Sequence, residues 1–236
     1  MPTAALVSRE LKGLADPQKK KILQSFFKTG PGQYGEGDLF LGVTVPQSRL
    51  VARKYAGLDF PEIRKLMHSP VHEERLAGLM ILVFQFQGGN ETERGKIFRF
   101  YLKHAERVNN WDLVDLSADK IVGAYLRGRS KSRLYRLARS RNLWRRRIAI
   151  VATLDFIRAG RFKDTTALAE KLMGDSHDLI HKACGWMLRE TGKRDSVVLE
   201  IFLKKHCRAM PRTMLRYAIE RLPAPRKRAY MKGQIS

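Results

Sequence analysis

Apolar residues recur at spacings of three and four along nearly the whole chain after residue 45, whereas the strict alternation expected of strands is scarce. This pattern predicts an all-α protein. The pattern is interrupted at Gly, Pro, Asn and Asp, which commonly begin or end helices. The predicted helices cover residues 17–29, 46–56, 60–68, 70–87, 91–108, 110–126, 131–139, 142–159, 163–173, 177–191, 194–208 and 211–221, and one clear Gly-rich loop is "GPGQYGEGD" (30–38).

A repeat is visible in the basic positions. Four segments share a basic residue followed, two positions later, by a small one, and the basic residues are Arg75, Arg147, Lys182 and Arg216. Their intervals are 72, 35 and 34 residues, and halving the first interval places a fifth copy at Trp111. A period of this length is typical of two-helix units of the HEAT or armadillo type. The alternative is coincidence, because Lys and Arg are abundant in this chain.

The repeat predicts a curved α-solenoid of HEAT-like helix pairs with about 12–14 helices. We expect one domain over residues 1–236, with irregular N-terminal helices and the Gly-rich loop in 1–45, repeats over about 46–221, and a short basic tail at 222–236. In such an array, equivalent positions of the second helices line the inner surface. The four basic repeat residues are therefore expected to form a basic concave groove for a phosphate backbone. The small residues that follow them, which would allow close helix packing, are Ala77, Ala149, Cys184 and Ala218.

The charge of the chain points to a polyanionic partner. There are 46 Lys+Arg against 23 Asp+Glu, a net charge of +23, and nucleic acid, an anionic membrane or an acidic protein would each compensate it. The membrane fits least, because the longest apolar run (76–86) is too short to span a bilayer. No signal peptide is recognisable, and the two cysteines lack a CxxC spacing. We therefore expect a cytoplasmic protein with reduced thiols.

The densest basic cluster is "RGRSKSRLYRLARSRNLWRRR" (127–147), where ten of 21 residues are Lys or Arg, including Arg145 and Arg146. A solvated helix face is the usual explanation of a charge run. Here no acid interleaves to form pairs one helical turn apart. The cluster is therefore predicted to contact DNA phosphates, with binding that weakens steeply as salt is raised.

Metal chemistry is not predicted. His177 and His181 are four residues apart, as are His68 and His72, but neither pair has the HExxH carboxylate. No GxxxxGK[ST] or GxSxG motif occurs either, so nucleotide hydrolysis and serine-type acyl transfer have no motif.

The stretch "NNWDLVD" (109–115) carries the most specific chemistry. Asn110 is expected to cap a helix that begins at Trp111, and Asp112 suits the positive helix end. Asp115 lies one turn beyond Trp111 on the same face, and Trp186 lies one turn beyond Lys182. A carboxylate among cations can offset positive charge that develops on a nucleotide, and tryptophan faces attract cations. The alternative is that both tryptophans only pack and that Asp115 only favours the helix start.

At these residues the sequence resembles the AlkD family of bacterial DNA alkylation-repair glycosylases. The matching patches are "LFLGVTVPQSR" (39–49), "WDLVD" (111–115), "NLWRRRIAI" (142–150) and "KACGWMLRETGK" (182–193). The resemblance implies a HEAT-like array that excises cationic 3-alkyl- and 7-alkylpurines from duplex DNA without a metal or cofactor.

The resemblance also implies roles for single residues. Asp115 corresponds to the catalytic carboxylate, Trp111 and Trp186 to aromatic residues near the lesion, and Arg147 to the arginine near the lesion's phosphate. Tyr34 is matched to a tyrosine near the site, although the intervening loop here is one residue shorter. Arg49 is expected to contact the DNA backbone.

Three functions are compatible with the sequence. The first is a monofunctional alkylpurine DNA glycosylase that acts as a monomer on double-stranded DNA containing alkylated bases. The second is a non-catalytic nucleic-acid-binding scaffold, which would have no reason to keep Trp111, Asp115 and Trp186 together. The third is an adaptor for acidic proteins, which the acid-free run 127–147 disfavours.

Overall fold

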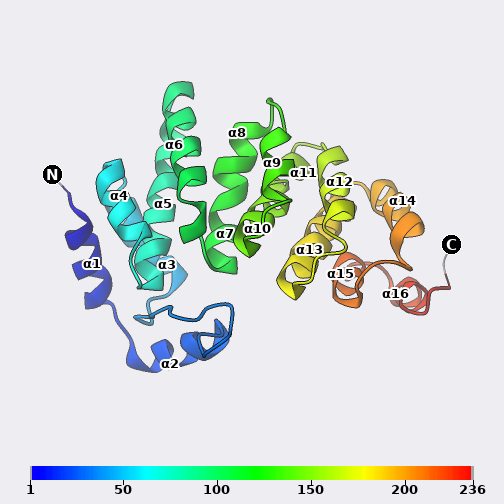
Figure 1. Ribbon diagram of the computed structural model, residues 1–236, viewed down its shortest axis with the longest axis horizontal. Helices are drawn as coiled ribbons and strands as arrows, with labels where there is room; N and C mark the ends of the chain where they lie inside the picture. The colour runs from blue at the N-terminus through cyan, green and yellow to red at the C-terminus, as the bar shows by residue number, and fades with distance from the viewer. Residues whose placement is uncertain (1, 235–236) are drawn as a thin grey trace. The chain divides into compact units, whose positions relative to one another are not determined.

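The computed structural model describes residues 2–234, and within them the regular structure is helical, without a strand (Figure 1). The all-α prediction is confirmed. Residues 2–234 contain sixteen α-helical segments, and joining the two interrupted helices, α7 with α8 and α10 with α11, leaves fourteen continuous ones. The chain divides into two compact units, residues 1–121 and 122–236. The single repeat domain over 1–236 stays a prediction.

The first unit is built around helix α5. Its helices are α1 (Ala4–Gly13), α2 (Pro17–Phe26), α3 (Val45–Lys54), α4 (Phe60–Met67), α5 (His72–Gly88), α6 (Glu91–Lys103), a 3₁₀ turn (Ala105–Arg107) and α7 (Trp111–Ala118). Helix α5 packs against α3, α4, α6 and α7. It contains the apolar run 76–86, most of whose side chains are buried, as expected of a helix with neighbours on every side.

The second unit has its helices in two layers. A π-helical turn (Asp119–Gly123) at the boundary leads to α8 (Ala124–Leu126), α9 (Ser132–Leu137), α10 (Leu143–Val151), α11 (Leu154–Arg158), α12 (Lys163–Lys171), α13 (Asp178–Arg194), α14 (Ser196–His206), α15 (Arg212–Ala218) and α16 (Ala224–Met231). Helices α10, α13 and α15 pack successively on one another, and we call them the second-helix row. Helices α9, α12 and α14 pack on this row (Figure 1).

Helix starts follow the caps that the sequence indicates. The Asp59 side chain accepts from Glu62 N, Asn142 accepts from Trp144 N and Arg145 N, and Asn90 forms a capping box with Glu93. Each cap satisfies backbone donors that have no partner within the helix.

The five repeat positions each fall on a different helix. These helices are α5, α7, α10, α13 and α15, the second helices of the predicted pairs.

Small residues allow these helices to approach closely. The four small residues of the repeat, Ala77, Ala149, Cys184 and Ala218, are all buried, as predicted. Next to one of them, a Cβ added to Gly185 would lie 2.5 Å from Met214 O on α15. Any side chain at Gly185 would therefore push α13 and α15 apart.

The C-terminal segment differs from the prediction of a basic tail, because residues 224–231 form α16. The Tyr230 ring is buried and its hydroxyl donates to Glu200 on α14, and Arg226 forms an ion pair with the same carboxylate at 2.7 Å. The basic composition of this segment suggested a solvated tail. One buried aromatic ring and one ion pair are nevertheless enough to hold a short helix against α14.

Candidate functional site at the start of helix α7

Helix α7 presents the predicted pair of residues. It begins at Trp111, whose backbone N–H donates to the Asn110 side chain at 2.8 Å, so the predicted cap is confirmed. Trp111 and Asp115 are partly exposed, whereas Asp112 between them is buried. The two partly exposed side chains occupy the same side of the first turn of α7.

Trp111 and Asp115 line an apolar cavity of about 560 Å³ in the first unit. Its other walls come from α2, the segment 40–46 and the start of α5. Helix α2 has no buried residue, and two apolar side chains on the cavity side, Ile22 and Phe26, are 65% and 59% exposed. A concave apolar site with a few polar groups is typical of a ligand pocket.

Trp111 is the end of a stack of four rings. Its ring stacks on Phe27 at 5.1 Å between centroids, Phe27 on Phe40 at 5.1 Å, and Phe40 on His72 at 4.5 Å. Phe26 also contacts Trp111 edge-on at 5.8 Å. Sequence reasoning missed these residues, and the signal available for Phe26 and Phe27 was the aromatic pair that ends the first predicted helix.

Tyr34 lies next to the end of helix α2. It is not among the described residues that line the cavity, but its hydroxyl lies 3.5 Å from the backbone oxygen of Phe26, which does line it. The rings that contact Trp111 belong to Phe26 and Phe27. The placement of Tyr34 near the site stays a prediction.

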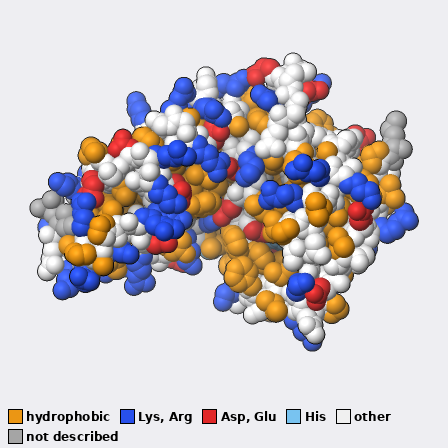
Figure 2. Space-filling view, turned by 180° about the vertical axis from the view of Figure 1, so that it is seen from behind, with side chains coloured by type: hydrophobic (Ala, Val, Ile, Leu, Met, Phe, Trp, Pro, Cys, Tyr) orange, Lys and Arg blue, Asp and Glu red, His pale blue; other side chains and the backbone are white. Residues whose placement is uncertain are grey.

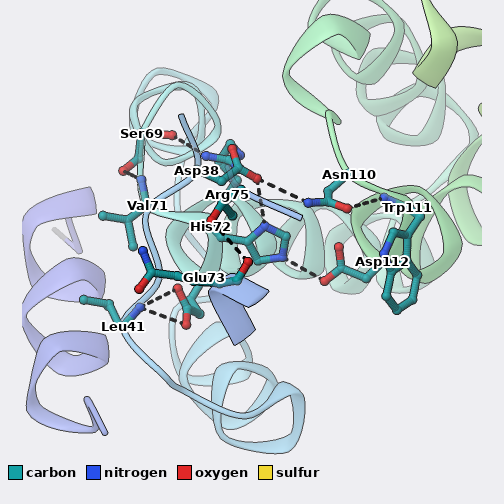
Figure 3. A network of polar contacts seen from close by, with 12 residues as sticks. Asp38, Leu41, Ser69, Val71, His72, Glu73, Arg75, Asn110, Trp111 and Asp112 are labelled. Carbon is teal, nitrogen blue, oxygen red and sulfur yellow. Dashed lines mark hydrogen bonds and ion pairs between the residues drawn. The ribbon is translucent and has the colours of Figure 1, made fainter. Parts of the chain in front are cut away.

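A buried polar cluster supports the base of α7 (Figure 3). His72 Nε2 lies 2.8 Å from Asp112 Oδ2, and His72 Nδ1 lies 3.4 Å from Asp38 Oδ2. Asn110 donates to Asp38 Oδ2 at 3.3 Å, and Arg75 forms an ion pair with Asp38 Oδ1 at 2.6 Å. Both neighbours of Trp111 in the sequence, Asn110 and Asp112, are therefore held by the same buried group of side chains.

The charges of this cluster depend on one another. Burial opposes a positive charge on His72, but the Asp112 carboxylate and the contact with Asp38 outweigh it and raise the pKa of His72 to about 9. Burial likewise opposes the charge of Asp38, and His72 and Arg75 together lower the pKa of that carboxyl. His72 is therefore an imidazolium at neutral pH, paired with two carboxylates.

This arrangement corrects the prediction for Arg75. Its side chain is 3% exposed, pairs with Asp38 and donates to Ser69 O at 2.9 Å. A guanidinium used inside the protein cannot also bind a DNA phosphate without leaving its partner. The helical position was predicted correctly, but the side chain points into the cluster and has no access to a surface.

Glu73 fixes the segment that forms one wall of the cavity. Its buried carboxylate accepts from the backbone N–H groups of Leu41, Gly42 and Val43 at 2.8–3.2 Å. Gly42 has φ +88°, and an added Cβ would lie 2.1 Å from Asp16 O at the start of α2. The glycine of the "LFLGVTVPQSR" patch therefore lets α2 lie directly against this segment.

The substitution Gly42→Ala is expected to lower the free energy of unfolding by about 2–3 kcal/mol, because it adds both backbone strain and a clash with α2. Urea denaturation would measure the loss. Gly57→Ala is the matched control, since a Cβ at Gly57 meets nothing within 4 Å. Equal stability of the two variants would contradict the role assigned to Gly42.

The second unit holds most of the remaining predicted residues. Trp186 lines a separate cavity of about 200 Å³ with Leu154, Ile157, Arg158, Glu190 and Arg194. Lys182, partly exposed, forms an ion pair with Asp178 at 2.8 Å, and Arg216 is exposed on α15. Arg49, on α3 of the first unit, is also exposed.

Two of the predicted arginines of α10 are used within the protein. Arg147 is 5% exposed and donates to Leu179 O on α13 at 2.5 Å. Arg146 pairs with Asp175 through two contacts of 2.5 and 3.1 Å. Both therefore hold α10 to the start of α13, and the prediction that they bind DNA phosphates is not retained. Arg145 is partly exposed.

The surface remains strongly basic despite these internal pairs. Figure 2 shows Lys and Arg side chains spread over one face of the molecule, with few acidic side chains and some hydrophobic ones between them. Such a surface attracts polyanions.

The comparison with protein families decides the identity of the chain. The model of a family described as DNA alkylation repair enzyme matches residues 7–222. The chain belongs to this family. The resemblance inferred from the four sequence patches is thereby confirmed, and a role in DNA repair is supported.

A solved structure shows the same fold as this DNA alkylation repair family member. It is described as a predicted DNA alkylation repair enzyme from Enterococcus faecalis, with a TM-score of 0.67 and 15% sequence identity. The match covers 89% of this chain and 97% of that one. No curated protein is significantly similar to the chain.

Two further properties concern metals and membranes. Among residues 2–234, no group of three or more His, Cys, Asp or Glu side chains is arranged to hold a metal ion. In that same part of the chain, none of the helices has the length and apolar character needed to cross a membrane.

Proposed function

We propose that this member of the DNA alkylation repair family is a monofunctional DNA glycosylase. Its substrates are cationic purines alkylated at N3 or N7 in double-stranded DNA, and it acts as a monomer in the bacterial cytosol or nucleoid. The proposal is carried mainly by one observation: Asp115 and Trp111 lie together, partly exposed, in a cavity whose walls are otherwise largely apolar.

The chemistry needs an anion at the deoxyribose. As the bond from C1′ to the purine nitrogen breaks, its electron pair neutralises the cationic purine and positive charge develops on the sugar. Asp115 offsets this charge and orients a water whose oxygen bonds to C1′, and the water's proton passes to the carboxylate or to solvent. Apolar surroundings strengthen this attraction, because they screen charge less than water does.

Trp111 suits the purine itself. A tryptophan face next to a cationic ring contributes about 0.5–2 kcal/mol of attraction. Phe27 supports the Trp111 ring from its other face, so the indole is held in place before substrate binds. We assign to Trp186 the same kind of aromatic contact, and to Arg49, Arg145, Lys182 and Arg216 contacts with the DNA backbone.

The direct test is release of 7-methylguanine from methylated duplex DNA by the purified protein. We expect release well above the spontaneous rate, with no effect of a metal chelator, because no step requires a metal. A release rate no higher than the spontaneous rate from DNA alone would overturn the proposal that the protein is an enzyme. It would favour a non-catalytic DNA-binding scaffold, provided the protein still binds the duplex.

A further inference from the structure

Apart from Arg145, the cations of the basic cluster at 127–147 separate into two groups. Several are used internally: Arg127 pairs with Asp155 at 2.8 Å, Lys131 donates to Arg127 O and Arg129 O, and Arg129 lies over the Tyr125 ring. With Arg146 and Arg147, these cations have partners that local spacing did not reveal. The lack of acids within the cluster therefore does not mean that all of its cations lack partners.

Four arginines of the cluster form the other group. Arg133, Arg136, Arg139 and Arg141 are exposed, and no ion pair is described for them within residues 2–234. We call them the outer arginine surface. Some exposed cations elsewhere have acidic partners, as in Lys65 with Glu62, Lys193 with Glu190 and Lys205 with Glu170. Four neighbouring cations without such partners repel one another and gain most from a polyanion.

Helix α9 and the turn after it hold this surface in a defined position. Leu134 and Ala138 are buried, and the Tyr135 hydroxyl donates to Asp164 on α12 at 2.9 Å. Arg133 and Arg136 lie three residues apart on α9, a rise of about 4.5 Å along the helix, and Arg139 lies in the turn that follows. Phosphates on one DNA strand are spaced by about 3.4 Å of axial rise, so arginines at this spacing can contact neighbouring phosphates.

The outer arginine surface lies away from the second-helix row. Helix α9 packs on α10, and its buried side chains face that contact, so its arginines point to the opposite side. The residues assigned to the DNA backbone in this unit, Arg145, Lys182 and Arg216, are instead on α10, α13 and α15. One duplex lying along the second-helix row would leave the four arginines free for another polyanion.

We propose that the outer arginine surface is a second DNA-binding site, which holds the phosphate backbone of another duplex segment. DNA is the polyanion that a DNA alkylation repair protein meets, so the inference rests on family membership and not on glycosylase chemistry. An anionic membrane is disfavoured because no large apolar side chain is exposed between residues 51 and 196. Contacts of this kind position DNA without reading its sequence.

The test compares three variants with the wild type. One carries Arg133→Gln, Arg136→Gln and Arg139→Gln, and a second carries Lys at the same three positions. The control carries Lys204→Gln, Arg208→Gln and Arg228→Gln, which remove equal charge from exposed positions of α14–α16. Each protein is mixed with excess short duplex DNA for sedimentation, and with immobilised duplex to measure capture of free duplex.

We expect the wild type, the Lys variant and the control to bind two duplexes per chain and to capture free duplex. The Gln variant is expected to bind one duplex and to lose capture. Capture needs both sites, whereas the Gln variant binds through one. Between 50 and 200 mM salt, the affinity measured by wild-type capture should therefore fall about 40-fold more than the affinity of the Gln variant for its single duplex, as the loss of three phosphate contacts predicts.

Other outcomes would overturn the inference. Binding of one duplex by the wild type, undiminished capture by the Gln variant, loss of capture in the control, or preference for duplex RNA over DNA would each do so. Capture is measured with unmodified duplex and the glycosylase with release of 7-methylguanine, so failure of the glycosylase proposal and failure of this one can be told apart.

Discussion

The substitution Asp115→Asn is expected to lower the rate of 7-methylguanine release by about 10²–10⁴-fold, the range typical of losing one catalytic acid–base group or electrostatic stabiliser. Asparagine keeps the shape of the side chain but has no charge to offset the oxocarbenium ion and no basic oxygen to accept a proton. Single-turnover kinetics with excess protein over methylated duplex would measure the effect on the chemical step alone.

The fold and DNA affinity of this variant should change little. Asp115 is partly exposed, and asparagine keeps the size and polarity of its side chain, so the packing around α7 is kept. The control is Glu91→Gln, which removes an equal charge from the exposed first turn of α6 in the same unit. Wild-type rates for Asp115→Asn, or an equal loss in Glu91→Gln, would remove Asp115 from the catalytic role.

The buried His72 should make the stability of the protein depend on pH. Its folded pKa of about 9 lies above the unfolded value of 6.5, so the folded state binds the proton more tightly. The stabilisation is complete below pH 6.5 and is lost as the pH rises through about 9. We expect the free energy of unfolding to fall by about 3 kcal/mol over this window.

His72→Gln is expected to remove this dependence. At neutral pH it should also cost about 3–5 kcal/mol, because Asp112 would stay buried without its cationic partner. Urea denaturation at several pH values, followed by tryptophan fluorescence, would measure both effects. The fluorescence is informative because Trp111 ends the ring stack that includes His72.

His68→Gln is the control for this prediction. His68 is largely exposed, and partial desolvation together with two neighbouring arginines lowers its pKa from 6.5, so it binds its proton no more tightly in the folded state. This variant should keep the wild-type slope. A wild-type stability that stays constant from pH 6.5 to 9, or a slope that persists in His72→Gln, would show that the cluster is not charged as described.

The DNA alkylation repair enzyme family was recognisable from sequence because its signals are local. The helices, their caps and the equivalent positions of the second helices follow from spacing within one or two turns. The placement of Trp111 and Asp115 on one side of α7 follows from the same spacing, together with the cap at Asn110. Each depends on side chains close together in the chain, whose relative positions a helix determines by itself.

The predictions from sequence were wrong for side chains whose partners lie far away in the chain. Arg75 and Arg147 occupy the expected helices, yet the first is buried against Asp38 and the second donates to Leu179 O. A basic residue in a periodic pattern looks the same whether it points to solvent or to an acid that arrives from another helix. The burial of these side chains therefore could not be predicted from their spacing.

The sequence by itself thus determined an all-α chain of paired helices, its family, and the residue pair at the start of α7. Only the tertiary structure decided that His72 lies between Asp38 and Asp112, 34 and 40 residues away, and that Phe26 and Phe27 face Trp111. It also decided which cations remain exposed. The reason is physical: local spacing sets the direction of a side chain on its own helix, whereas burial and charge pairing depend on which distant segments exclude water from it.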